Sequence, residues 1–423
     1  MSSPLTATES VGPSAAGVLV RTLPIPDPGP LLDRLPDTSG AAWVRRGDGM
    51  VGWGVAAEFR VSGDERFSRT QRWWNTWCRE AVVEDALQVP GSGPIAFGSY
   101  TFDPTPDSGA TSVVVVPRVV LGRRDGQSWL TVVGDASTTL PPVSVPPAPA
   151  EVAWEQGTLT PEEWQAAVSE VISRISRGEL DKVVLARDVI ATVDEGFDAR
   201  YLLQQLAAAY PECWTFGVAG LYGATPELLV RRTGDVVMSR VLAGTVKRRG
   251  DESVDASLAA ALLGSGKDLE EHEYAVHSVA KALAAHCTDL DVPSRPHVLR
   301  LPNVQHLATD VTGELADGAP VLALAAALHP TAAVCGTPTE RAFATIRELE
   351  GMDRGRYAGP VGWFDSRGDG EFGIALRCAQ VDGQRLRLFA GCGIVAGSDP
   401  EAELAESRAK LLPVREALSG AGA

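Results

Sequence analysis

Runs of hydrophobic residues predict strands over the first third of the chain. Valine fills positions 113–116, and residues 129–133 read WLTVV, so both segments are rich in the β-branched and aromatic residues that strands favour. The segment 140–150, LPPVSVPPAPA, breaks this pattern, because prolines favour an extended chain that cannot join a β-ladder. We therefore expect a proline-rich linker between two parts of the chain.

Beyond the linker, the pattern changes to helices separated by short buried strands. Thr160, Pro161 and Glu163 predict a helix start, with threonine as N-cap, proline at the first position and glutamate closing a capping box. Apolar periodicity extends that helix to about residue 177, and the run 182–186 predicts a buried strand. The same criteria predict helices over 199–209, 255–263, 268–288 and 321–328, and strands over 214–218 and 228–232.

The last quarter of the chain predicts a β-meander followed by a helix. Strands are expected over 361–365, 372–381 and 385–395. Asp382-Gly383 between the last two is a strong hairpin signal. Ser398 or Asp399 can cap a final helix that has Pro400 at its first position. Because adjacent strands are joined by hairpins and mixed with helices, the pattern favours an α+β fold over a doubly wound parallel sheet.

The chain divides into three segments on these grounds. Residues 1–16 are small and polar, which predicts a disordered tail. Residues 17–150 form an N-terminal part that ends in the proline-rich linker. Residues 151–423 form the region that carries the chemical motifs described below.

Charge and composition narrow the class of protein. The net charge of −16 and the absence of a basic run argue against a nucleic-acid partner. The N-terminus has no basic start followed by an apolar core, and the longest apolar stretch, around 320–328, is too short to span a bilayer. The six cysteines form no CxxC pair. We expect a cytoplasmic protein with reduced thiols and no membrane partner.

Two pairs of carboxylates stand out on predicted helices. Asp268 and Glu271 are three residues apart, as are Glu403 and Glu406, so the members of each pair point the same way. A single such pair is more often a solvated helix face. Two pairs near glycine-rich loops indicate a Mg²⁺ site, because this ion takes hard oxygen ligands and keeps positions open for substrate. A divalent cation would also let an acidic protein hold an anionic substrate.

Lys182 and Glu227 are the two candidates for proton transfer. Lys182 stands at the edge of an apolar strand, and a lysine there usually keeps its amine in water. Burial would instead lower its pKa and make it a general base. Glu227 follows a proline, where an ordinary turn residue is the common case. Held protonated by its surroundings, it would serve as a general acid.

A series of motifs resembles the chorismate-utilising enzymes, which include isochorismate, salicylate, anthranilate and aminodeoxychorismate synthases. The matching segments, in the order of that family, are KVVLAR at 182–187, ATPELL at 224–229, LAGT at 242–245, KDLEEH at 267–272, QHLAT at 305–309, HPTAAVCGTP at 329–338, YAGPVGW at 357–363, IALRCA at 374–379 and GCGIVAGSDPEAELAES at 391–407. The resemblance implies one large α+β domain, like that of anthranilate synthase component I, with two opposed, mainly antiparallel sheets flanked by helices and the site between them.

The same resemblance assigns roles to individual residues. Lys182 resembles the base that activates water for attack at C2 of chorismate, and Glu227 the acid that protonates the departing C4 hydroxyl. Glu271 and Glu406 resemble ligands of Mg²⁺, with Asp268 and Glu403 in support. The implied substrate-binding residues are Gly244, Thr245, His306, Ala333, Tyr357, Arg377, Gly391 and Gly393, of which Arg377 would grip the enolpyruvyl carboxylate.

The branch of the family is indicated by a few positions. Lys182 occupies the base position of the branch that uses water, and FGSYTFD at 97–103 resembles the N-terminal segment of isochorismate synthases. Ala333 stands where isochorismate synthases tend to have alanine and relatives that eliminate pyruvate often have threonine. The expected activity is conversion of chorismate to isochorismate by a monomer with no obligatory amidotransferase subunit. Salicylate synthase is the alternative, and anthranilate or aminodeoxychorismate synthase component I is a more distant one.

Overall fold

The N-terminal third of the chain folds mainly into antiparallel strands, as its hydrophobic runs predict. In the computed structural model, which describes residues 9–11 and 15–420, the long strands of this part pair side by side. The strands are β1 (Glu9–Val11), β2 (Leu19–Ile25), β3 (Ala41–Arg45), β4 (Asp48–Val61), β5 (Val82–Asp85), β6 (Ile95–Ser99), β7 (Ser112–Arg124) and β8 (Gln127–Val133). Both predicted strands of this region are present, within β7 and β8. Only the β2–β5 pair is parallel among the described strands.

The remaining strands come from the second part of the chain. They are β9 (Val152–Gln156), β10 (Lys182–Val193), β11 (Trp214–Val218), β12 (Leu221–Thr225), β13 (Leu228–Thr233), β14 (Val236–Lys247), β15 (Cys287–Asp291), β16 (His297–Arg300), β17 (Val304–Leu315), β18 (Gly336–Thr337), β19 (Pro360–Asp365), β20 (Gly370–Ile374), β21 (Cys378–Asp382) and β22 (Arg385–Ile394). The Asp382–Gly383 hairpin is confirmed, because Asp382 pairs with Arg385 at the start of β22.

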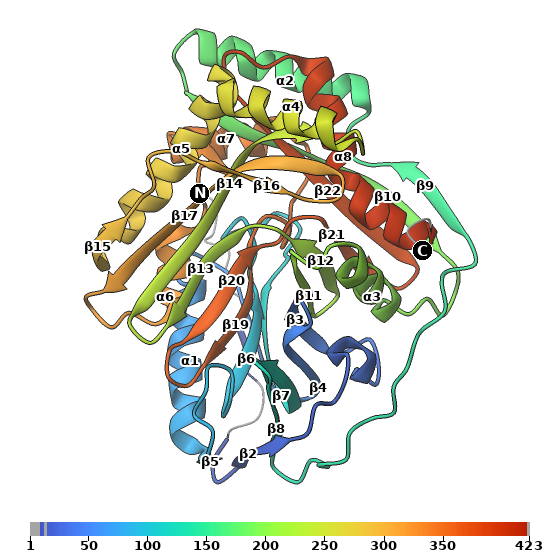
Figure 1. Ribbon diagram of the computed structural model, residues 1–423, viewed down its shortest axis with the longest axis vertical. Coiled ribbons are helices and arrows are strands. Elements are labelled where there is room, and N and C mark those ends of the chain that lie inside the picture. Colours follow the sequence, from blue (N-terminus) through green and yellow to red (C-terminus); the bar gives the residue numbers. More distant parts are fainter. Residues whose placement is uncertain (1–8, 12–14, 421–423) are drawn as a thin grey trace, which may run out of the picture.

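Strand pairing joins both parts of the chain into one α+β domain with two arms. The first arm runs β17–β14–β13–β20–β19–β6–β7, and the second runs β3–β11–β12–β21–β22–β10–β9. Strand β4 connects them, because it pairs with β7 on one edge and with β3 on the other. Figure 1 shows β14 and β17 on one side of the molecule and β10 and β22 on the opposite side. The expected α+β fold is confirmed.

Helices cover the outer faces of the arms. They are α1 (Arg66–Glu80), α2 (Pro161–Ser176), α3 (Arg200–Ala209), α4 (Glu252–Gly264), α5 (Gly266–Leu283), α6 (Val321–Leu328), α7 (Thr339–Leu349) and α8 (Pro400–Ser419), with a 3₁₀ helix, η1 (Leu31–Arg34). The capping box at Thr160 and Glu163 is present, and Asp399 caps α8 through its side chain. Helix α8 packs on β22, and α5 packs on β14. Among the described helices, none is long and apolar enough to cross a membrane.

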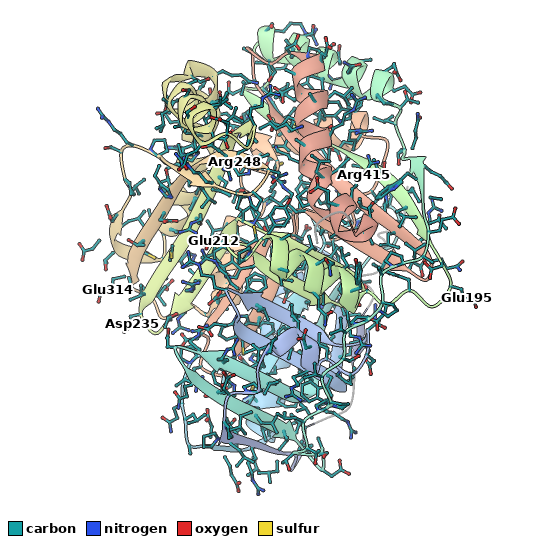
Figure 2. The ribbon with its side chains drawn as sticks, turned by 45° about the vertical axis from the view of Figure 1, so that its right-hand side comes forward. Glu195, Glu212, Asp235, Arg248, Glu314 and Arg415 are labelled. Atoms are coloured by element: carbon teal, nitrogen blue, oxygen red, sulfur yellow. The ribbon has the colours of Figure 1, made fainter. Side chains whose placement is uncertain are left out.

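The segment between β8 and β9 contains no helix or strand. It runs as a long extended excursion along the side of the molecule before β9 begins (Figure 1). Backbone contacts hold it at intervals, as where the amide of Ser144 donates to the carbonyl oxygen of Asp33 at 2.9 Å. Figure 2 shows three acidic residues at the periphery of the molecule: Glu195 and Asp235 in turns, and Glu314 near the end of β17.

Three sequence expectations differ from the structure. Most of the expected tail, residues 1–16, lies outside the described residues, but Glu9–Val11 forms β1 and pairs with β4, so the expectation is wrong there. The helix expected over 268–288 ends at Leu283, because the chain then turns into β15 along β17. The strand expected over 372–381 is broken into β20 and β21, and the break holds Arg377.

Candidate active site

A cavity lies between the two arms, and all eight predicted substrate-binding residues line it. Its empty volume is about 580 Å³, part of which is open to solvent. Its walls come from β14 on one arm, from β10 and β22 on the other, and from the loops around residues 226, 333, 357 and 377. The predicted residues that line it are Glu227, Gly244, Thr245, Glu271, His306, Ala333, Tyr357, Arg377, Gly391 and Gly393. Lys182, Asp268, Glu403 and Glu406 are not among the lining residues.

Glu227 is buried at the turn between β12 and β13. The side chain of Thr225 accepts a hydrogen bond from the Glu227 amide at 3.3 Å, and the Glu227 carbonyl oxygen accepts one from Ile374 at 3.2 Å. Only 5% of the residue is exposed. Burial raises the pKa of Glu227 to about 8, and the charges of Lys182 and Arg377 only partly oppose this shift. The carboxyl is therefore a proton donor at neutral pH.

Lys182 begins β10 and is fully buried rather than held in water. Its Nζ lies 3.3 Å from Oε1 of Glu271 and donates to the Glu271 carbonyl oxygen at 3.4 Å. Gly393 on the neighbouring strand makes room for this pair. A Cβ added at Gly393 would lie 2.0 Å from Oε1 of Glu271 and 3.0 Å from Cε of Lys182. Glycine is needed at this position for the lysine and the carboxylate to meet.

His306 links two of the predicted substrate residues. Its Nδ1 is 3.1 Å from Oγ1 of Thr245, and its Nε2 is 3.4 Å from Nη2 of Arg377. Burial, followed by the nearby charge of Arg377, holds the pKa of His306 well below its ordinary value. The ring is neutral, so Nε2 can accept from Arg377 while Nδ1–H donates to Thr245. The chain of contacts orients the guanidinium along one wall of the cavity.

The position of Arg377 depends on the break between β20 and β21. The Arg377 backbone adopts a left-handed conformation, with φ of 48°. This conformation lies outside the β region, so Arg377 cannot be part of a continuous strand. Ala358, whose amide donates to the carbonyl oxygen of Ala375 at 2.9 Å, has φ of 60°. Left-handed backbone at residues other than glycine costs energy and often occurs where function requires a fixed geometry. The break directs Arg377 into the cavity.

Two carboxylates of α8 lie close together beside β22. Glu403 pairs with Lys267 at 2.6 Å, and Glu406 pairs with Lys410 at 2.6 Å. Burial and the charge of Glu406 both raise the pKa of Glu403, so the two glutamates repel each other. Oxygens of both carboxylates and the Sγ of Cys392 lie within 4.8 Å of one another. The negative charges of these two carboxylates are balanced by Lys267 and Lys410.

Asp268 differs from the other acidic residues of the predicted set. Its carboxylate hydrogen bonds to the hydroxyl of Ser265, the N-cap of α5. A Cβ added at Gly244 would lie 3.1 Å from the Asp268 Cβ, so the aspartate backs the wall formed by Gly244. It supports the cavity from behind.

Sequence reasoning missed two charged residues of the cavity wall. Lys410 lies on α8 with 13% of its side chain exposed and donates to the carbonyl oxygen of Gly391 at 2.9 Å. Although burial disfavours its charge, Glu406 raises the pKa of Lys410. The four-residue spacing of Glu406 and Lys410 could have indicated the pair.

Arg354, the second missed residue, is a buried brace behind the cavity. It pairs with Glu350 and donates to the carbonyl oxygens of Val334 and Val184, both at 2.8 Å. It thereby ties the loop after α6 to β10. The four-residue spacing of Glu350 and Arg354 could have indicated their ion pair, whereas the two backbone partners are brought together only by the fold.

Comparisons with known proteins agree with this geometry. The sequence model described as "Chorismate binding enzyme" matches residues 43–140 and 138–419. The chain is 34% identical to the isochorismate synthase MenF of Bacillus subtilis over 88% of this chain and 85% of that protein. It is 35% identical to the salicylate biosynthesis isochorismate synthase of Pseudomonas aeruginosa over 90% of this chain and 85% of that protein.

A solved structure extends the comparison to three dimensions. MenF, the menaquinone-specific isochorismate synthase of Escherichia coli, has a similar structure, with a TM-score of 0.79 and 26% identity over 97% of this chain and 96% of that one. A cavity with a buried acid, a buried lysine and an arginine between two antiparallel arms defines an enzyme that binds a small anionic substrate. The chain belongs to the family of chorismate binding enzymes.

Proposed function

We propose that the protein is an isochorismate synthase, which converts chorismate to isochorismate. Water adds at C2 of the ring, the double bonds shift, and the C4 hydroxyl leaves as water, so the reaction is an isomerisation. The observation that carries the proposal is the protonated Glu227, buried in the same cavity as Arg377. The relatives named above, two of them aligned over most of their length, support the same reaction.

Two proton transfers accompany this reaction. Lys182 is the proposed base that takes a proton from the attacking water, and Glu227 gives its proton to the departing hydroxyl. Each transfer typically contributes roughly 10²–10⁴-fold to the rate. The burial of both side chains supports these roles, because neither has bulk water to compete for its proton. Thr225 and Ile374 fix the backbone on either side of the Glu227 carboxyl.

The two carboxylates of chorismate need positive charge at two places. Arg377 is the partner for the enolpyruvyl carboxylate, a task that suits a guanidinium. Tyr357 lines the same cavity beside Gly391, since a Cβ added at Gly391 would be 3.2 Å from the tyrosine hydroxyl. Neutral His306 faces the ring without adding a charge of its own.

The ring carboxylate is assigned to a divalent metal ion, for which the acidic cluster is suited. Enzymes of this family that make isochorismate require such an ion. Glu271 and Glu406 are the proposed ligands, with Glu403 and Asp268 in support. Carboxylate oxygens are hard donors, which favours Mg²⁺ over softer ions. When bound, the ion supplies positive charge to the ring carboxylate. Each of the carboxylates of Glu271, Glu403 and Glu406 forms an ion pair with a lysine. These ion pairs support the proposal that the acidic cluster favours a bound cation.

The test is incubation of the purified protein with chorismate and Mg²⁺, without ammonium, followed by separation of the products. A mixture of chorismate and isochorismate without pyruvate is the expected result. Salicylate with pyruvate would identify a salicylate synthase instead. A reaction that begins only when ammonium is added would mean that water is not the nucleophile. The Lys182→Ala variant is the matched control, and wild-type rates from it would remove the lysine from the base role.

The oligomeric state and the cellular compartment of the enzyme follow from the same reasoning. We infer that it acts as a monomer in the cytoplasm and needs no amidotransferase subunit. Its six cysteines are all free thiols, which suits a reducing compartment. Size-exclusion chromatography with light scattering measures the mass directly, and activity without added partners tests the second point.

A further inference from the structure

Strand β10, which begins with the proposed base Lys182, lacks a neighbouring strand along part of one edge. On that edge, β18 pairs only with Lys182 and Val183, and β9 pairs only from Val189 onward. The backbone groups of Val184 and Ala186 lie in the interval between these two strands. A buried amide or carbonyl group without a hydrogen-bond partner destabilises a fold, so this interval needs partners that do not come from a strand.

An ion pair between Glu350 and Arg354 supplies two of these partners. Glu350 directly follows α7, which packs on β10, and its Oε1 accepts from the amide of Ala186 at 2.7 Å. The Nη2 of Arg354 donates to the carbonyl oxygen of Val184 at 2.8 Å. Nε and Nη2 of Arg354 also donate to the Glu350 carboxylate, at 2.9 and 2.5 Å. Charged side chains thus take the place of a paired strand along this part of β10.

The same arginine fixes two further segments of the cavity wall. Its Nη1 donates to the carbonyl oxygen of Val334 at 2.8 Å and so holds the turn that contains Ala333. Its own carbonyl oxygen accepts from the amide of Tyr357 at 3.0 Å, and its guanidinium lies 6.0 Å from the centre of the tyrosine ring. Val184, Ala333, Val334 and Tyr357 all line the catalytic cavity, as does Arg354. One guanidinium therefore connects three segments of that wall.

The contacts of Arg354 leave it no free donor for a substrate. The residue is 3% exposed, and all three guanidinium nitrogens have partners within the protein. Arg377 differs, because the described residues give its guanidinium a single side-chain hydrogen bond, of 3.4 Å, to His306. Arg377 is available to bind a carboxylate, whereas Arg354 can act only through the wall that it holds.

We propose that Glu350 and Arg354 are positioning residues, whose ion pair holds β10, the turn with Ala333, and Tyr357 in the arrangement that binds chorismate. The inference rests on the proposed function, because it concerns how the same cavity holds that substrate. The three segments carry the proposed base Lys182 and two of the substrate-binding residues, so a change in their relative position alters several contacts of the substrate together. A misplacement of about 1 Å can cost an enzyme roughly 10²-fold in rate.

The test replaces the ion pair without leaving a buried charge. The double variant Glu350→Gln with Arg354→Met keeps side chains of similar size, and neutral replacement of a buried ion pair is often tolerated, so the variant should fold. The KM for chorismate, measured with Mg²⁺ by consumption of chorismate, should rise by about tenfold or more. A smaller folded fraction lowers the apparent kcat but leaves KM unchanged, so KM separates positioning from a merely structural role. A wild-type KM in the folded double variant would overturn the inference.

Glu371→Gln is the matched control. Glu371 is likewise a buried carboxylate bound by arginines, but neither it nor Arg124 and Arg231 lines the catalytic cavity. Its KM should equal that of the wild type, and an equal rise in this variant would contradict a specific role for the pair. Should the double variant not fold, Arg354→Lys keeps the charge beside Glu350 but cannot reproduce the fork of donors, so KM should rise by roughly threefold or more. An unchanged KM in Arg354→Lys contradicts the inference.

A binding measurement separates this inference from the proposed function. In the Glu227→Gln background, where the reaction is slowed, titration calorimetry measures the affinity for chorismate with and without the double substitution. The double substitution should weaken binding by about tenfold. If the wild type consumes chorismate without forming isochorismate, the proposed function fails, and the comparison of affinities still tests the pair. If the wild type forms isochorismate and the two affinities are equal, the inference alone fails.

Discussion

Two buried glutamates on adjacent strands show how partners decide what a carboxyl does. Glu227 precedes β13, and Glu371 lies on β20, which pairs with β13. Each is 5% exposed. Burial raises the pKa of Glu227 to about 8. Burial acts on Glu371 in the same direction, but Arg231 and Arg124 overcome it and lower its pKa.

The hydrogen bonds explain the difference. Oε2 of Glu371 accepts from the indole nitrogens of Trp43 and Trp214 at 3.0 and 3.1 Å, and its Oε1 meets Arg124 and Arg231, both at 3.1 Å. That carboxylate is fully partnered and holds strands together. Glu227 faces a cavity with no ion-pair partner among the described residues. Depth of burial alone therefore does not identify a candidate acid, whereas burial without an ion-pair partner does.

The largest expected effect is on the rate. Glu227→Gln keeps the shape of the side chain but removes its proton, so kcat/KM should fall by roughly 10²–10⁴-fold. The thermal midpoint should stay the same or rise, because a carboxyl that has no ion-pair partner is costly to bury. Steady-state kinetics with chorismate and a melting curve measure the two properties. A variant that keeps its rate would leave Glu227 without the role of acid.

The converse substitution should act on stability. Glu371→Gln leaves Arg124 and Arg231 without their counter-charge, which should lower the free energy of unfolding by about 3 kcal/mol. The folded variant should keep kcat within a few-fold of wild type. Urea unfolding and kinetics on the same preparation test this, and an unchanged urea midpoint would show that the network does not stabilise the fold.

The pH dependence should have opposite signs at the two glutamates. Between the ordinary value of 4.5 and about 8, the folded state binds more protons at Glu227 than the unfolded state, so this residue makes stability fall as pH rises. The slope approaches about 1.4 kcal/mol per pH unit. Glu371 contributes stability above 4.5 that is lost as pH falls through its lowered pKa. Comparing unfolding of wild type and Glu227→Gln across this range isolates the first slope, and identical slopes would contradict the assigned pKa.

The smallest expected effect comes from a single arginine of the network. Arg231→Gln leaves Arg124 and both indoles on Glu371, so the loss should be about 1 kcal/mol. Arg231 is partly exposed, with 31% of its side chain accessible, which limits the effect further. Urea unfolding at low and high salt measures it. A loss as large as that of Glu371→Gln would mean that Arg231 alone supports the network.

Local sequence patterns predicted most elements of this fold, because capping residues, turns and apolar runs act over short distances. The start of α2 at Thr160 and the hairpin at Asp382 are examples. The break at Arg377 could not be predicted, since a left-handed arginine is imposed by the strands around it. The pairing of Glu9–Val11 with β4 is likewise a long-range contact.

The site was predictable to the extent that motifs carry it. The motif residues of the substrate set converge on one cavity, as the resemblance implies. The contacts that these residues make with one another could not be predicted from the sequence motifs. The contact of Lys182 with Glu271 joins positions far apart in sequence, and it requires a glycine at 393 on a third element. The roles of these residues in catalysis and metal binding stay predictions until they are measured.

The extended segment between β8 and β9 is a position at which the chain could be divided into two fragments. It is the sole covalent link between the strands before residue 133 and those after 152, and it includes exposed positions such as Val145, which is 74% accessible. The two pieces are also joined by pairing of β6 with β19 and of β3 with β11, and by the bonds of Trp43 and Arg124 to Glu371. They resemble two subunits that happen to be tethered. A protease nick at Val145, or two separately expressed fragments, should therefore still assemble into an active complex.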